Sequence, residues 1–170
     1  MDTRTRFFEL AVWPHMRSAY NLARWLVRNG EDAEDIVQEA SLKAFQALDR
    51  FRGGDARVWV LAIVRNTAMN FLRRRKPDVA SDFDRLEPAD RSPNPEQGLL
   101  EESRREQIRR AIARLEPEFR ETLVLREIEG LSYKEIAAVL DIPAGTVMSR
   151  LSRARQRLLV ELAPVERGSS

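Results

Sequence analysis

The segment from Pro77 to Gly98 constrains the fold of this chain most, because it separates two regions that are each too short for a large hydrophobic core. It holds four of the eight prolines of the 170-residue chain, lacks periodic apolar residues, and carries six acidic side chains against two arginines. A segment of this composition cannot bury enough apolar surface to offset its conformational entropy. The sequence therefore predicts two small domains, residues 1–76 and 103–164, joined by a flexible acidic linker, residues 77–102.

Both flanking regions have the apolar spacing of helices, with hydrophobic residues at i, i+3, i+4 and i+7, and neither shows convincing strand alternation. The helices expected in the first region cover about residues 16–27, 33–51 and 57–75. Those expected in the second region cover about residues 108–115, 119–128, 132–140 and 143–162. The predicted fold class is all-α.

Composition excludes several kinds of protein. Cysteine is absent, which rules out disulfides and thiolate metal sites, and the sequence has no metal-ligand cluster or phosphate-binding glycine loop. The single histidine, His15, follows Pro14 and is expected at a surface or boundary rather than in a catalytic role. We therefore expect no enzymatic activity, metal, cofactor or small-molecule substrate. No apolar run approaches the roughly 20 residues that span a bilayer, so we expect a cytoplasmic protein without membrane insertion.

Residues 132–158 have the spacing of a helix-turn-helix. Ala137 is small where two helix axes would approach, and Ser132 with Glu135 fits a capping box at the start of the first helix. Asp141 occupies the turn position that requires a positive φ, which Asp adopts more readily than most side chains. The apolar residues around the turn are Leu140, Ile142, Val147 and Leu151. An ordinary helical hairpin is the alternative.

The charge of the last helix favours DNA binding over a simple hairpin. The formal net charge is only +2, so a strong field must come from uneven distribution, and residues 146–160 contain no acid. Arginine suits both bidentate contacts to guanine and clamps on phosphate. The residues expected to face outward are Met148, Ser149, Ser152, Arg153, Gln156 and, in part, Arg150.

The third predicted helix has a second face, with spacing of four, three, four and three residues. It consists of Trp59, Ile63, Asn66, Asn70 and Arg73. Rings stack on exposed bases, amides recognise base edges and cations follow the backbone, so this face suits a single strand of nucleic acid. Alternatively, the two apolar residues belong to the core and the asparagines are simply solvated.

The second predicted helix begins with an acidic stretch, Glu31 to Glu39. Acidic residues favour helix N-termini, which explains part of it. Asp35, Gln38 and Glu39 continue the polar face beyond the first turn, where a nucleic acid would be repelled. This pattern suggests a protein partner with a basic surface.

Four stretches carry a resemblance to a known family: DAEDIVQEA, FRGG, VWVLAIVRNTAMNFLRRR and LSYKEIAAVLDIPAGTVMSRLSRAR. In this order and spacing they resemble the bacterial sigma factors of the extracytoplasmic-function group. The resemblance covers nearly the whole chain outside the linker and the two ends. It implies a two-domain initiation subunit that binds core RNA polymerase and directs it to promoters.

The resemblance also implies roles for individual residues. The clamp helices of the largest polymerase subunit would bind Asp35, Gln38, Glu39 and Leu42. Capture of the melted −10 element, with a flipped base, would fall to Gly53, Gly54, Asp55, Asn66, Asn70 and Arg73. Recognition or clamping of the −35 element would fall to Thr146, Met148, Ser149, Arg150, Ser152, Arg153 and Arg155. The linker would thread toward the polymerase active-site channel, and an anti-sigma factor would regulate the protein.

Three positions depart from the pattern of that family. Asp141 replaces a common Gly, Met148 replaces a frequent basic residue, and Val58 replaces a small hydroxylated one. These departures bear on which promoter is recognised. The competing interpretation is a conventional repressor or activator that uses the helix-turn-helix without binding polymerase. It leaves the acidic helix and the asparagine face unexplained.

Overall fold

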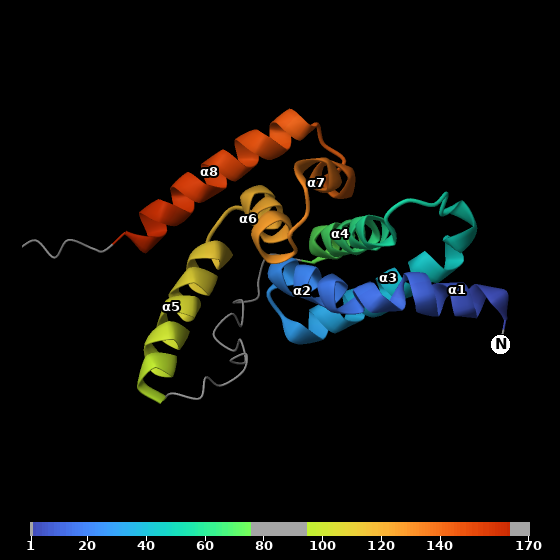
Figure 1. The fold of residues 1–170 in the computed structure, drawn as a ribbon, viewed down its shortest axis with the longest axis horizontal. Coiled ribbons are helices and arrows are strands. Elements are labelled where there is room, and N and C mark those ends of the chain that lie inside the picture. Colours follow the sequence, from blue (N-terminus) through green and yellow to red (C-terminus); the bar gives the residue numbers. More distant parts are fainter. Residues whose placement is uncertain (1, 76–94, 164–170) are drawn as a thin grey trace, which may run out of the picture.

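The computed structural model describes residues 2–75 and 95–163, with side chains from 98 onward in the second part. Every regular element within these residues is helical, which confirms the predicted all-α class (Figure 1). The first part contains α1 (Thr3–Ala11), η1 (Trp13–His15), α2 (Met16–Val27), α3 (Gly30–Gln46), η2 (Leu48–Arg50) and α4 (Ala56–Arg74). The second part contains α5 (Pro95–Ala113), α6 (Pro117–Leu123), the π-helical turn η4 (Val124–Ile128), α7 (Tyr133–Leu140) and α8 (Ala144–Leu162).

The first half is built on α2, α3 and α4, which pack against one another. Their apolar stripes meet in a core that includes Leu22, Ile36 and Leu61, all essentially inaccessible to solvent. Helix α2 ends at Arg28, which takes the left-handed conformation, and the Asn29 side chain then caps α3. These local signals fix the angle at which α3 returns along α2.

Helix α1 is the one α-helix of the described first half that the sequence did not predict. None of its residues is fully buried, so it lacks the wide apolar stripe by which such helices are recognised. It is held by side-chain contacts to α3 and η2, including an edge-on contact between Phe8 and Phe45 with ring centroids 5.6 Å apart. Arg4 adds an ion pair with Asp49 at 3.3 Å.

The second half packs α6, α7 and α8 around a smaller core. Phe119, Leu125, Ile136 and Leu151 contribute its largest buried side chains. Helix α5 joins this domain through contacts with α8, and Arg114, directly after α5, forms an ion pair with Glu161 of α8 at 3.2 Å.

The end of the predicted linker differs from the structure. Residues 76–94 lie outside the described residues, but α5 already begins at Pro95, before the predicted boundary at residue 103. Proline suits the first turn of a helix, and the following Leu-Leu-Glu-Glu favours helix. Leu99 and Leu100 remain about 70% exposed, so helix forms here without the burial that the sequence prediction used as its criterion.

The two halves pack against each other. Helix α4 lies along α7, and α2 contacts α6, as the ribbon shows at the centre of the molecule (Figure 1). This arrangement brings the first helix of the predicted helix-turn-helix next to the loop and helix predicted to bind a single strand.

Candidate nucleic-acid interfaces

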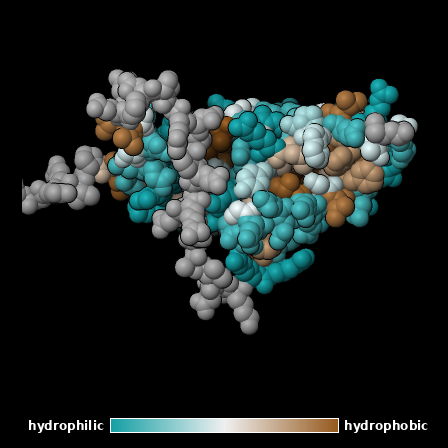
Figure 2. Space-filling view, turned by 90° about the horizontal axis from the view of Figure 1, so that it is seen from below, coloured by the Kyte–Doolittle hydropathy of each residue, from teal (hydrophilic) through white to brown (hydrophobic). Residues whose placement is uncertain are grey.

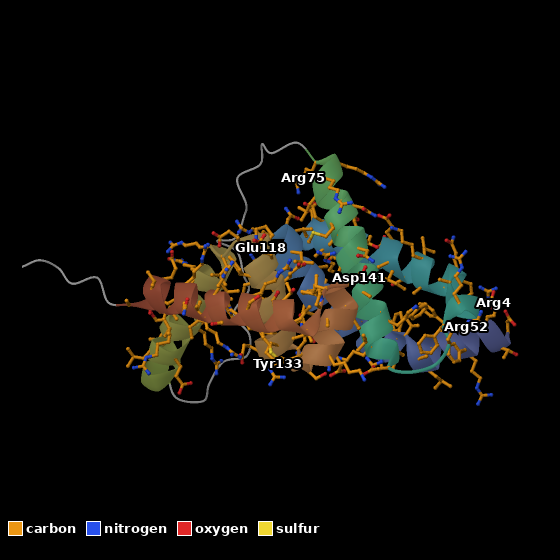
Figure 3. All side chains as sticks on the ribbon, turned by 90° about the horizontal axis from the view of Figure 1, so that it is seen from above. Arg4, Arg52, Arg75, Glu118, Tyr133 and Asp141 are labelled. Carbon is orange, nitrogen blue, oxygen red and sulfur yellow. The ribbon has the colours of Figure 1, made fainter. Side chains whose placement is uncertain are left out.

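Residues 132–158 form the capped helix-turn-helix that their spacing predicts. The Ser132 hydroxyl accepts a hydrogen bond from the Glu135 amide at 3.1 Å, and the Glu135 carboxylate accepts one from the Ser132 amide at 2.9 Å. Helix α7 ends at Asp141, which Figure 3 labels. Its φ of 53° is the positive value expected at the turn. The Ile142 amide closes the turn by donating to the Ala137 carbonyl at 3.1 Å.

The buried and exposed faces of α8 follow the predicted pattern. Val147, Leu151 and Ala154 are buried against α6 and α7. The residues of the opposite side, Met148, Ser149, Ser152, Arg153 and Gln156, are exposed, and Thr146 is half-buried at the helix start. This exposed face carries no acidic side chain, so its field is positive and accessible to an anionic ligand.

The arginines of α8 differ in their surroundings. Arg150 is half-buried and approaches the Glu121 carboxylate of α6 at 3.8 Å, so it faces the fold more than the sequence analysis expected. Arg155 donates to Glu127 at 2.8 Å, and hydrogen bonds to Glu127 and Tyr133 raise its pKa. Among the described residues, Arg153 has no ion-pair partner and is the arginine most available for DNA.

The loop before α4 is shaped by its two glycines. Gly53 and Gly54 have φ near 90°, a conformation that side chains rarely adopt, while their surroundings leave open space. Asp55 caps α4 by accepting from the Arg57 amide at 2.9 Å, so its carboxylate already has a structural role. Arg52 is exposed on this loop (Figure 3).

The second face of α4 divides into two parts. Trp59 and Ile63 are half-buried and pack against the core, with the Trp59 ring centroid 5.0 Å from that of Phe51. Asn66 and Arg73 are exposed, and half-buried Asn70 lies between them in sequence. The Arg73 guanidinium donates to the Asn70 side-chain oxygen at 3.4 Å. The packing interpretation therefore holds for the aromatic end, whereas the amide and cationic end is open to solvent.

The polar face of α3 forms a separate surface. Asp35, Gln38 and Leu42 are exposed at positions that share one face of the helix, and Leu42 is 65% exposed. Glu39 is half-exposed and pairs with Lys43 at 3.0 Å. An exposed leucine bordered by acids and an amide fits a partner that offers both apolar and basic groups.

Further exposed apolar side chains lie toward the end of the molecule formed by α1 (Figure 2). They include Phe7, Leu10 and Trp13. Within residues 2–75 and 95–163, no group of three or more acids and histidines is placed to hold a metal ion. The helices of the same residues are either too short or too polar to cross a bilayer.

Two acidic residues that sequence reasoning missed lie between the halves. Glu121 of α6 accepts two hydrogen bonds from Arg65 of α4, at 3.1 and 3.2 Å. Glu129, which follows η4, pairs with Arg57 of α4 at 3.1 Å. Each pair joins residues more than 50 positions apart, so no local pattern in the sequence could have identified it.

A capped helix-turn-helix with a basic outer face, joined to a second helical domain with an exposed amide face, defines a helical DNA-binding protein of the transcription machinery. Residues 12–77 match the family model for sigma-70 region 2, and residues 105–158 match the model for sigma-70, region 4. The chain belongs to the extracytoplasmic-function group of RNA polymerase sigma factors, which are transcription initiation factors.

Individual relatives support this assignment along the length of the chain. The ECF RNA polymerase sigma-E factor of Escherichia coli K12 is 39% identical over 171 residues, covering 94% of this chain and 88% of that protein. The RNA polymerase sigma-H factor of Pseudomonas aeruginosa is 36% identical over 172 residues, covering 95% and 89%.

Two solved structures also share the fold. The sigma factor RpoE from Bartonella quintana, solved with the anti-sigma factor NepR, superposes with a TM-score of 0.73 at 27% identity, covering 94% of this chain and 98% of that one. CnrH, solved with the cytosolic domain of CnrY, gives a TM-score of 0.64 at 28% identity, covering 92% and 87%.

Proposed function

We propose that this chain binds core RNA polymerase and directs it to promoters by recognising a −35 duplex and capturing a melted −10 strand. The observation that carries the proposal is the exposed, acid-free face of α8 within a capped helix-turn-helix. The protein would act in the cytoplasm as a binding subunit and catalyse no reaction itself.

Helix α8 would enter the major groove of the −35 element. Its first exposed residues are small or flexible, including Ser149 and Ser152, which allows the helix to approach the base edges closely. Arg153 would bind guanine or phosphate, and Arg155 would bind phosphate after leaving Glu127. Met148 occupies a position where the family frequently has a basic residue, so one polar contact to the −35 element would be missing here.

The −10 element would be captured by the loop before α4 and by the open end of the α4 face. Flipping a base out of the stack costs a few kcal/mol, which contacts to the unpaired base must offset. Asn66 and Asn70 supply amides for base edges, and Arg73 supplies a cation for the backbone. Because these contacts form only with the unpaired strand, they favour melting without ATP.

The exposed surface of α3 would bind polymerase, with Leu42 as its apolar centre and Asp35, Gln38 and Glu39 around it. One structural relative was solved with an anti-sigma factor. We propose that this chain is likewise held inactive by such a partner until a signal releases it.

Run-off transcription with purified core polymerase on a pool of genomic fragments tests the proposal. We expect discrete transcripts that require this chain, and their upstream sequences should share two elements. A Leu42→Asp variant should lose transcription and polymerase binding together, because a carboxylate replaces the apolar centre of the binding surface. The fold should be unaffected, since an exposed side chain contributes little to stability. Leu100→Asp, the same change at an exposed leucine of α5, is the matched control. A chain that binds DNA but never associates with polymerase would instead be a conventional repressor or activator.

A further inference from the structure

Met148 is the one long side chain on its part of the exposed face of α8, as the structure describes that helix. Its exposed neighbours three or four positions away are all small, namely Ala144, Gly145 and Ser152. Met148 is 53% exposed, and a Cβ atom added at Gly145 would meet no neighbouring group within 4 Å. A ligand that approaches the start of α8 therefore meets Met148 as the longest side chain available.

The polar groups nearest to Met148 along the helix already have partners within the fold. The Arg150 guanidinium lies 3.8 Å from the Glu121 carboxylate of α6, and the Arg150 side chain is only 26% exposed. The Ser149 hydroxyl donates to the Thr146 carbonyl at 3.0 Å, so its hydrogen is used within α8. The first exposed arginine along α8 is Arg153. The first two turns of α8, all within the described residues, therefore offer an apolar group and no free cation.

The chemistry of base edges in the major groove limits what such a side chain can recognise. A recognition helix places its N-terminal residues against those base edges. Guanine presents two acceptors there, which require a donor such as arginine, whereas thymine presents a C5-methyl group that is recognised through apolar contact. A thioether has no hydrogen to donate, and its flexible, polarisable chain adapts to apolar surfaces. A methyl group is therefore the base-edge feature that Met148 is best suited to contact.

We propose that Met148 makes this chain select a base with a C5-methyl group, in the first place thymine, at one position of the −35 element. This inference rests on the proposed function, because Met148 meets a base only when α8 lies in the major groove. Removing one methyl group from water changes an affinity by about fourfold. Arg153 follows five positions later, so its contact with DNA is separate from the methyl contact.

Holoenzyme assembled from core polymerase and the full-length chain tests the inference on a promoter found by run-off transcription. Each thymine of the −35 element, on either strand, is replaced singly by deoxyuridine, which removes the methyl group and keeps every hydrogen-bonding group. We expect one replacement that lowers the affinity of the wild-type holoenzyme about fourfold. Met148→Ala should bind the thymine and deoxyuridine duplexes equally. Leu159→Ala, at an exposed residue about three turns further along the same face, should keep the fourfold difference.

A second modified base tests the same contact by gain of affinity. At the responsive position, exchanging the T·A pair for C·G should lower the affinity of the wild-type holoenzyme. Placing 5-methylcytosine there instead of cytosine should then raise it about fourfold, and Met148→Ala should show no such rise. Met148→Gln keeps the side-chain length but replaces the thioether by an amide, so it should also lose the methyl dependence. It decides the test if the alanine variant fails to fold.

The outcomes separate this inference from the proposed function. The inference is overturned if no thymine of the −35 element responds to deoxyuridine, or if the Met148 variants respond as the wild type does. Loss of the response in Leu159→Ala as well would also overturn it. Normal promoter binding without any methyl dependence refutes this inference alone. A chain that selects no promoter refutes the proposed function, and the inference with it.

Discussion

Replacing Arg153 by Ala should weaken binding to the −35 element while leaving the stability of the fold unchanged. The side chain is exposed on α8 and has no ion-pair partner among the described residues, so its removal leaves no buried group unpaired. Surface changes of this kind usually alter the free energy of unfolding by less than about 0.5 kcal/mol. A bidentate contact to guanine contributes about 1–3 kcal/mol of discrimination, equivalent to a roughly 5- to 150-fold loss of affinity.

The assay compares holoenzymes containing wild-type or Arg153→Ala protein on promoters with and without a −35 match. Affinity should fall only on the matched promoter if Arg153 contacts a base. If the contact is to phosphate, the loss should be uniform and the salt dependence should decrease by about one ion. Arg110→Ala on α5 is the matched control. An unchanged affinity together with an unchanged salt dependence would refute the assignment of this face of α8 to DNA.

Three further changes probe other parts of the molecule. Asn66→Ala should reduce permanganate reactivity of the melted −10 strand about tenfold, consistent with loss of one or two contacts to an unpaired base. The affinity for polymerase should stay constant. An equal loss of reactivity and of polymerase affinity would contradict the assignment. Ser132→Ala should lower stability by about 1 kcal/mol in thermal unfolding because it removes the cap of α7, whereas Ser103→Ala should not. Burial, with a smaller effect of Arg28, lowers the pKa of Arg120 to about 10. The free energy of unfolding should therefore rise between pH 10 and 12, where the unfolded chain binds the proton more tightly than the folded chain. Arg120→Met should remove that rise, as measured by urea titrations at several pH values. An equal dependence of the unfolding free energy on pH in the two proteins would refute this prediction.

The local features of the fold could be predicted because they depend on neighbouring residues. The capping box at Ser132, the positive φ at Asp141 and the inward stripe of α8 all follow from spacings of three or four positions. The same logic was less accurate on α4, where the apolar spacing predicts five buried residues: Val58, Leu61, Ala62, Ala68 and Leu72. Leu61 and Ala68 are fully buried as predicted, but the other three are half-buried, whereas Val60 and Val64 are fully buried. A helix that contacts neighbours on several sides has no single apolar stripe to identify.

The features that escaped prediction depend on tertiary packing. Glu121 and Glu129 look like ordinary surface acids in sequence, yet packing between the halves buries both. Arg150 lies beside the predicted DNA-binding face, but the proximity of α6 turns it toward Glu121. Such assignments require the relative placement of helices, which no periodicity encodes.

The burial of the paired glutamate determines which arginines of α8 can leave that glutamate and bind DNA. Arg155 and Arg157 pair with Glu127 and Glu116, whose side chains are about half exposed, and exposed pairs of this kind contribute at most about 1 kcal/mol. Phosphate can therefore displace those acids at little cost. Arg150 faces a carboxylate that is almost fully buried, and its departure would leave that charge to Arg65 alone.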